Sequence, residues 1–285
     1  MPTASDLAPT WLGLVDDAAI FPPGDTPLHD AATDHAARRS EWWSDFVGPF
    51  VVRDIDVPHL RGSSARLSVV VTGGAGQLLG PVGLCRKLGL RLAGLEIALR
   101  DPDDLAGNAR RVVAAVRAAR VDGALPDDVP VYVELPQSDP GSDWLRAADE
   151  IAQAELRLKF RTGGLEADLF PSARTLAWWI DAALDRETPF KCTAGMHRAL
   201  RHRDPGTGFE HHGFLNVLVA TRHAFDGFAT HEVAAILDEQ DDAALITLAM
   251  NTELSGGRRW FTSFGSCSVE EPLESLVATG LLEDL

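Results

Sequence analysis

Short apolar runs alternate with longer helical patterns along most of the chain, and this alternation limits the fold more than any other feature. The strand-like runs are residues 11–21, 48–55, 65–74, 92–99, 129–136, 155–164, 189–195 and 259–266. Helical patterns follow most of them, near 28–46, 77–89, 102–120, 141–153, 172–187 and 269–282. Strands that alternate with helices form βαβ units around a parallel sheet. Eight such strands in 285 residues predict a (β/α)8 TIM barrel, with a doubly wound open sheet as the alternative.

The seventh and eighth predicted strands are separated by far more residues than one crossover needs. The intervening segment, 197–258, contains helical patterns such as "FLNVLVATRHAF" and "THEVAAILDEQ". We therefore predict a barrel made of residues 1–196 and 259–285. Between its seventh and eighth strands we predict an inserted helical subdomain, residues 197–258, on the same end of the barrel as the active site.

Composition excludes several function classes. The formal net charge of −16 argues against nucleic-acid and membrane-surface partners, which need basic patches. No stretch approaches the roughly 18 continuous apolar residues of a membrane span, and the first residues lack the pattern of a signal peptide. The three cysteines are far apart and odd in number, which predicts a reducing cytoplasmic location rather than a disulfide framework.

Polar residues lie at or near the carboxyl ends of the predicted strands, which is where (β/α)8 barrels carry their catalytic residues. They include Asp16, Arg53, Glu96, Glu134, Lys159, Arg161, Lys191, Thr193 and Ser266. Successive strand residues point to opposite faces. In "LRLKFRTGG" the apolar Leu158 and Phe160 suit the helix-facing side, so Lys159 faces the barrel interior. The same argument turns Lys191 of "PFKCTAG" inward, where Glu96 and Glu134 can also point.

Two inward lysines indicate carbonyl chemistry. A buried cation is unfavourable unless paired, and a second cation nearby lowers its pKa. The neutral amine that results is a nucleophile that can form a Schiff base with an aldehyde or ketone. Glu96 or Glu134 can then carry protons. From spacing alone a purely structural network of ion pairs is slightly favoured, because such networks also occur inside barrels.

Several motifs, taken in order, resemble the class I deoxyribose-phosphate aldolase family, a group of (β/α)8 barrels. The family's "K-T-S-T-G" corresponds to Lys159-Phe160-Arg161-Thr162-Gly163, and its "F-K-P-A-G-G" to "FKCTAG" with Lys191 and Gly195. The family's strand-four aspartate, which relays protons, corresponds to Glu96, before "LAGN". Its strand-five glutamate corresponds to Glu134. Its phosphate-binding turn "F-G-A-S-S" falls on Phe264-Gly265-Ser266-Cys267-Ser268. The resemblance implies Lys159 as the Schiff-base lysine, Lys191 as the residue that tunes it, and Glu96 as proton carrier.

Departures from the family pattern indicate a different substrate. Glu96 stands where the family has an aspartate, and "F-R" replaces "T-S" after the nucleophile. Bulky Phe160 and cationic Arg161 favour a substrate with a carboxylate or another anionic group. We therefore predict a Schiff-base aldolase or lyase acting on a small anionic carbonyl compound, phosphorylated or carboxylated, with no cofactor. A homodimer is left open. The predicted substrate-binding residues are Asp16, Arg53, Arg161, Thr162, Gly163, Thr193, Gly195, His197, Gly265, Ser266 and Ser268.

Two other functions remain open. A metal-dependent lyase or isomerase could use Glu96, Glu134 and His197 as ligands. The segment 197–214 also holds His202, His211 and His212, but without HxH or HExxH spacing, so we expect no metal. A non-catalytic barrel could instead bind an anionic metabolite.

The turn "FGSCS" likewise has two interpretations. Gly265 and the serines could present N–H and hydroxyl groups to a phosphate at the start of the last helix. Alternatively, Ser268 caps that helix and forms a capping box with Glu271.

Overall fold

The computed structural model describes residues 7–283 and shows a closed eight-stranded parallel barrel, which confirms the predicted TIM barrel. Its strands are β1 (Val15–Asp17), β2 (Val47–Arg53), β3 (Arg66–Val71), β4 (Arg91–Ala98), β5 (Val131–Glu134), β6 (Arg157–Arg161), β7 (Phe190–Thr193) and β10 (Phe261–Ser266). They follow one another around the barrel in chain order, and β10 closes it between β7 and β1. The alternative, a doubly wound open sheet, is therefore excluded.

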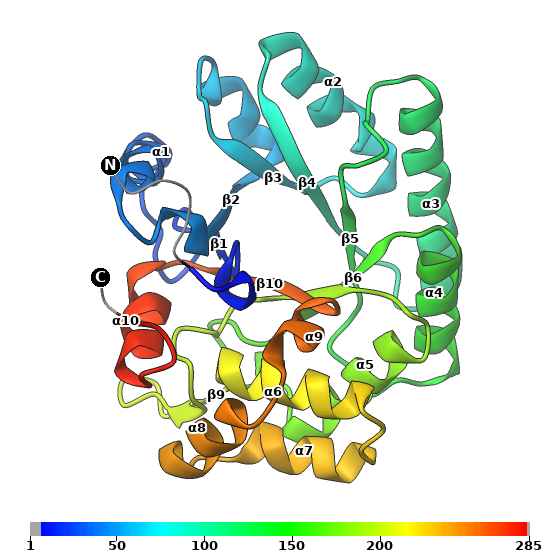
Figure 1. Ribbon diagram of the computed structural model, residues 1–285. Coiled ribbons are helices and arrows are strands. Elements are labelled where there is room, and N and C mark those ends of the chain that lie inside the picture. Colours follow the sequence, from blue (N-terminus) through cyan, green and yellow to red (C-terminus); the bar gives the residue numbers. More distant parts are fainter. Residues whose placement is uncertain (1–6, 284–285) are drawn as a thin grey trace.

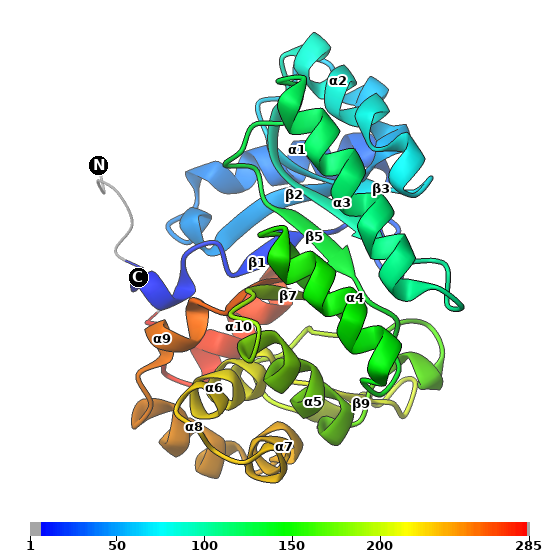
Figure 2. The same cartoon turned by 90° about the vertical axis from the view of Figure 1, so that its right-hand side faces the viewer.

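Helices surround the strands on the outside (Figures 1 and 2). They are α1 (Leu28–Ala37), α2 (Leu79–Leu88), α3 (Leu105–Val121), α4 (Ser142–Gln153), α5 (Ala173–Leu184), α6 (Phe214–Phe225), α7 (Thr230–Asp238), α8 (Asp242–Met250), α9 (Leu254–Arg258) and α10 (Glu270–Ala278). No helix within residues 7–283 is long and apolar enough to cross a membrane.

Successive side chains of β6 alternate between the barrel interior and the layer between the sheet and the helices. Phe160 faces outward, where its ring lies 6.3 Å from that of Trp144 and 5.5 Å from that of Trp179, on the covering helices α4 and α5. Lys159, its neighbour, points into the barrel, as the sequence pattern predicts. Phe160 therefore belongs to the layer between sheet and helices. Our inference that it shapes the substrate site was wrong.

The first third of the chain is less regular than predicted. The helix expected near 28–46 ends at Ala37, where Arg38 turns inward to Asp17 and Glu270, and two short 3-10 turns follow, Arg38–Ser40 (η2) and Ser44–Phe46 (η3). After β2 the chain forms a 3-10 helix, Asp54–Leu60 (η4), in place of a full α-helix. Pro58 lies inside η4, and a proline cannot donate the hydrogen bond that an α-helix requires. Three further 3-10 turns are Pro9–Trp11 (η1), Ala75–Gln77 (η5) and Ala167–Leu169 (η6).

The segment between β7 and β10 is not wholly helical. It begins with a two-stranded antiparallel hairpin, β8 (His202–Arg203) and β9 (Glu210–His211), and continues as α6 to α9. The hairpin lies at the carboxyl end of the barrel, whereas α6 packs against α5 and β10 on the outside, with α7 against both α5 and α6 (Figure 1). Apolar residues of α6 belong to the same core as the strands. A separate subdomain of residues 197–258 remains a prediction.

Candidate active site

A cavity of about 1070 Å³ lies at the carboxyl end of the barrel, where (β/α)8 enzymes carry their active sites. Its charged and histidine lining consists of Glu96, Arg100, Glu134, Lys159, Arg161, Lys191, His197, Arg198, His202, Asp204, His211, Glu271 and Glu274. Thr193, Gly195, Gly265 and Ser266, all predicted from the sequence, also line it. A volume of this size suits a small metabolite.

Lys159 and Lys191 stand side by side at the base of this cavity, because they are register partners on β6 and β7. Both are buried, with 4% and 1% of their surfaces exposed. Each ammonium lies 2.7 Å from a different oxygen of the Glu96 carboxylate. The chain contains only one other lysine, Lys87, which is exposed on α2. The two inward lysines therefore converge on one carboxylate, as the alternation predicts.

Glu96 is the centre of the network, and only 1% of it is exposed. Besides the two lysines, it accepts a hydrogen bond of 2.6 Å from the hydroxyl of Ser68 on β3. Burial alone would raise the pKa of Glu96, but Lys159 and Lys191 outweigh it and hold the pKa well below its usual range. Glu96 is therefore an anion at neutral pH.

Asp16 is the second carboxylate, besides Glu96, that holds Lys191. Its carboxylate contacts the Lys191 ammonium directly and accepts a hydrogen bond of 3.0 Å from Ser263 on β10. The ring of Tyr132 faces the same ammonium at 5.2 Å. Burial opposes the charge on Lys191, but Asp16 and Glu96 outweigh it, so its pKa is raised. Lys191 is thus a fixed cation beside Lys159.

Glu134 joins Lys159 to Arg161. One of its oxygens lies 3.0 Å from the Lys159 ammonium, and the other accepts a hydrogen bond of 2.9 Å from Nε of Arg161. Arg161 was predicted to bind an anionic group of the substrate. It lines the cavity and its guanidinium pairs with Glu134, so binding of a substrate anion there stays a prediction.

The protonation of Lys159 differs from the sequence prediction. Burial lowers its pKa, and Lys191 lowers it further, as expected. Glu134 and Glu96 act in the opposite direction and prevail, so the pKa of Lys159 is raised above its ordinary value. In this arrangement Lys159 is an ammonium ion. A neutral amine forms only after a proton passes to one of the carboxylates that touch it.

The glycines after β6 and β7 allow the two strand ends to meet. Gly195 has φ +77°, and a Cβ atom there would lie 2.9 Å from both Gly163 Cα and the Thr162 carbonyl oxygen. The hydroxyl of Thr162 donates to the Ala194 carbonyl at 2.7 Å, so Thr162 and Gly163 shape the wall beside Lys159 rather than line the cavity.

Gly195→Ala is expected to destabilise the protein by about 2–3 kcal/mol, since it combines a left-handed backbone with a close backbone contact. Gly123→Ala provides the matched control, because its φ is +63° with no neighbouring atom within 4 Å of the added carbon. Urea unfolding compares the two variants. Equal losses would show that the contact between the strand ends contributes nothing.

The turn after β10 lines the cavity with its first residues and leads into α10 with its last. Gly265 and Ser266 line the cavity, whereas Ser268, just before the N-cap residue Val269, accepts a hydrogen bond of 3.2 Å from the Glu271 backbone N–H in the first turn of α10. Glu271 and Glu274 also line the cavity on this side. Two carboxylates beside this helix start disfavour a phosphate there, because like charges repel.

Three of the histidines are neighbours, with ring centroids 6.3 Å apart for His197 and His211 and 5.2 Å apart for His202 and His211, but each ring makes its own polar contact. Nδ1 of His197 lies 2.9 Å from Glu271, and Nδ1 of His211 lies 2.9 Å from the Gly195 carbonyl oxygen. Within residues 7–283 no group of three or more His, Cys, Asp or Glu side chains is arranged to hold a metal ion. Glu96 and Glu134, the other ligands proposed for a metal, hold lysines instead.

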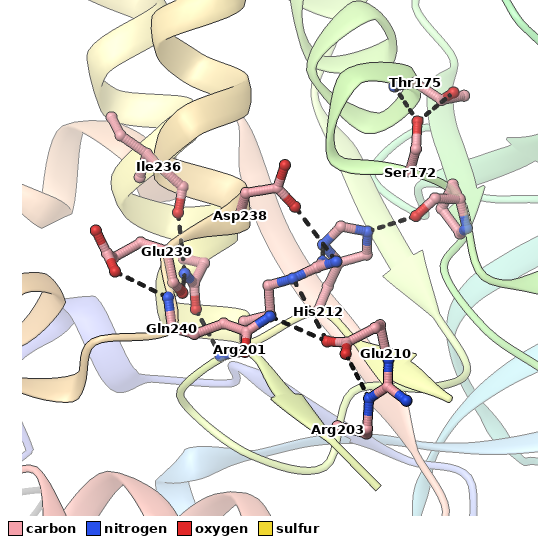
Figure 3. A network of polar contacts seen from close by, with 12 residues as sticks. Ser172, Thr175, Arg201, Arg203, Glu210, His212, Ile236, Asp238, Glu239 and Gln240 are labelled. Atoms are coloured by element: carbon pink, nitrogen blue, oxygen red, sulfur yellow. Dashed lines mark hydrogen bonds and ion pairs between the residues drawn. The ribbon is translucent and has the colours of Figure 1, made fainter. Parts of the chain in front are cut away.

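A polar network anchors the hairpin at the mouth (Figure 3). Buried His212 lies between Arg201, whose guanidinium is 3.0 Å from Nδ1, and the Pro171 carbonyl oxygen, 2.8 Å from Nε2. Glu210 of β9 pairs with Arg203 of β8 at 2.9 Å. His202 and His211 are held over the cavity by this anchored hairpin.

His212 predicts a pH dependence of stability. Burial and the nearby Arg201 lower its pKa from 6.5 to about 4. Between these values the unfolded chain binds a proton that the folded protein does not, so about 3 kcal/mol of stability is lost as pH falls from 6.5 to about 4. In urea unfolding measured at several pH values in this window, the free energy of unfolding of His212→Gln should depend less steeply on pH than that of the parent protein. A slope equal to that of the exposed control His29→Gln would contradict the assignment.

Arg53, a predicted site residue, lies outside the cavity lining. Its guanidinium turns back to Asp56 at 2.8 Å, within the first turn of η4. Sequence reasoning missed Ser68, Ser263 and Tyr132, which support the network from inward strand positions. The signal for the serines was a polar residue within an apolar strand.

The fold and the site define a class: a (β/α)8 barrel with paired lysines held by carboxylates at the base of its carboxyl-end cavity. Solved structures of similar fold include the deoxyribose phosphate aldolase from Aeropyrum pernix, described as having a unique tetrameric structure. The TM-score is 0.56 at 12% identity, over 96% of this chain and 94% of that chain. A putative deoxyribose-phosphate aldolase from Coccidioides immitis gives 0.51 at 13%, over 95% and 87%. The resemblance seen in the sequence is thus confirmed for the fold. No family model and no curated protein matches the chain.

Proposed function

We propose that this protein is a Schiff-base-forming aldolase or related lyase, with Lys159 as the nucleophile. The observation that carries the proposal is the convergence of Lys159 and Lys191 on Glu96 beneath a cavity of metabolite size. A carboxylate, a second cation and a reactive amine in contact are the parts that imine chemistry needs. The fold shared with deoxyribose-phosphate aldolases supports the same proposal.

The reaction begins with a proton transfer, because Lys159 is charged at rest. Glu134 and Glu96 both touch its ammonium and can take the proton as a carbonyl compound enters. The free amine then adds to the carbonyl carbon to give a carbinolamine. Loss of water, with the returned proton on the leaving oxygen, gives the imine. Lys191 remains a cation throughout, held by Asp16, and favours the neutral form of Lys159 by repulsion.

The charges that line the cavity suggest where an anionic group of the substrate would bind. Arg100 and Arg198 have no carboxylate partner among the described residues, whereas Arg161 is paired with Glu134. Glu271 and Glu274 occupy the side where α10 begins. We place the anionic group of the substrate at Arg100 or Arg198, and a neutral or cationic group near α10. This arrangement differs from a phosphate bound at the turn after β10.

Borohydride trapping tests the proposal. The protein is incubated with acetaldehyde or pyruvate, reduced, digested and analysed by mass spectrometry. Because the chain has only three lysines, each is assigned individually, and exposed Lys87 reports non-specific reaction. We expect an adduct on Lys159 with at least one of the two compounds, lost in Lys159→Arg. Adducts confined to Lys87 and the terminal amine would overturn the proposal.

A non-catalytic barrel that binds an anionic metabolite is the second candidate. The observation that favours it is the raised pKa of Lys159, which Glu134 and Glu96 cause in spite of burial and of Lys191. This candidate predicts no trapped adduct. A homodimer, a cytoplasmic location and the absence of a cofactor remain predictions from the sequence.

A further inference from the structure

A second cavity lies at the amino-terminal end of the barrel, opposite the lysines. Its volume is about 550 Å³, enough for a small metabolite. Its charged lining consists of Asp16, Arg66, Arg91, Asp128, Arg157 and Arg258. Because barrel chemistry belongs to the carboxyl end, this cavity is not part of the site described above.

Four arginines enter this cavity from positions that the fold fixes. Arg66, Arg91 and Arg157 are each the first residue of a strand, β3, β4 and β6. Arg258 ends α9, just before β10. Arg66 and Arg91 are register partners, so two like charges stand next to each other. Both residues are exposed, so water screens part of their repulsion, and an anion between or beside the two groups would turn the remainder into attraction.

None of the four arginines pairs with a carboxylate of residues 7–283. Arg157 donates to the Tyr132 hydroxyl at 3.0 Å, and Arg91 donates to a backbone carbonyl oxygen. The guanidinium of Arg258 donates to backbone carbonyl oxygens, including that of Phe261 at 2.8 Å, while its buried Nε has no partner among the described residues. Burial lowers the pKa of Arg258 to about 10, and the attraction of Asp16, which acts in the opposite direction, does not outweigh it.

The two carboxylates of the lining do not neutralise this charge. Asp16 is engaged by Lys191 and Ser263 deeper in the barrel, and exposed Asp128 has no ion pair among the described residues. In a chain of net charge −16, four unpaired guanidinium groups around one cavity are a local excess of positive charge. The planar fork of arginine matches carboxylate and phosphate oxygens.

We propose that this amino-terminal cavity binds a small polyanion, a phosphorylated or polycarboxylated metabolite, at a site separate from Lys159. Asp16 forms the wall between the two cavities, because its carboxylate lines this one and holds Lys191, which lines the other. Ser68 and Ser263 line the same cavity, but their hydroxyl groups already donate to Glu96 and Asp16, so the arginines carry the recognition.

Calorimetric titration of the full chain with pyrophosphate and with citrate, at constant ionic strength, tests the site. We expect saturable binding of at least one, which also identifies phosphate or carboxylate as the preferred group. In Arg66→Gln and Arg157→Gln the dissociation constant should rise about tenfold or more, the effect of losing one charge-assisted hydrogen bond. The matched control, Arg117→Gln, changes an exposed arginine of α3 and should bind as the parent does.

A fourth variant separates the two ends of the barrel. Arg198→Gln removes an unpaired arginine from the carboxyl-end cavity and should leave the measured affinity unchanged. Affinity that falls in Arg198→Gln but not in Arg66→Gln would assign the polyanion to the other cavity and overturn the proposal. Absence of saturable binding with both compounds would do the same.

Discussion

Replacing Glu96 by glutamine is expected to lower the free energy of unfolding by about 3–5 kcal/mol, the size of effect seen when one partner of a buried ion pair is removed. Glu96 is buried and contacts both lysine ammonium groups at 2.7 Å, so the amide would leave two buried cations with less compensating charge. Glu150→Gln is the control, because its pair with Arg110 on the surface is worth at most about 1 kcal/mol. Urea unfolding at neutral pH measures both variants.

The pH profile of the same variant supplies a second measurement. The pKa of Glu96 is lowered in the folded protein, so its stabilisation is fully present above the unfolded value and is lost as pH falls through the folded one. Glu96→Gln lacks that carboxyl group, so the loss of unfolding free energy that protonation of Glu96 causes at low pH should be absent from the variant. A loss no larger than that of Glu150→Gln would show that the lysines are not both charged. That result would favour an amine that is neutral at rest.

The sequence predicts which face of a strand a residue occupies, but not which residue of the neighbouring strand it pairs with. Alternation along a strand assigns faces, which is why Lys159, Lys191 and Glu96 were correctly placed inside the barrel. Partners depend on register between strands, which a single sequence does not contain. Lys159 stands level with Glu134 on β5 and with Lys191 on β7, and these pairings decide that carboxylates outweigh the second cation.

The errors share one cause, which is competition from local contacts. Arg53 was placed in the site from its position at a strand end, but Asp56, three residues later, pairs with it. Arg161 lines the cavity as predicted, but its pair with Glu134 on the neighbouring strand was not foreseen. The hairpin of residues 202–211 has only two residues in each strand, too few for a recognisable alternation. Periodicity therefore predicted the barrel more completely than its loops.

Lys159→Arg is expected to abolish carbonyl chemistry while the folded structure is kept. Arginine can retain the pairing with Glu96 and Glu134 but stays protonated and forms no imine. The measurement is exchange of the methyl protons of acetaldehyde or pyruvate with deuterated water, followed by nuclear magnetic resonance, which needs only the first half of an aldol reaction. We expect the protein-dependent rate to fall by on the order of 10³-fold or more, as when a covalent nucleophile is removed.

Two companion variants make this result specific to Lys159. Lys87→Arg changes the exposed lysine of α2 and should exchange at the rate of the parent protein. Lys191→Arg keeps a cation beside Asp16 and Glu96, so a smaller loss is expected there than at Lys159. Exchange that persists in Lys159→Arg would contradict the imine at this residue, whatever the trapping experiment gives. Because Lys159 starts as an ammonium ion held by two carboxylates, the exchange rate of the parent protein should also rise with pH, as the proton on Lys159 is lost more readily.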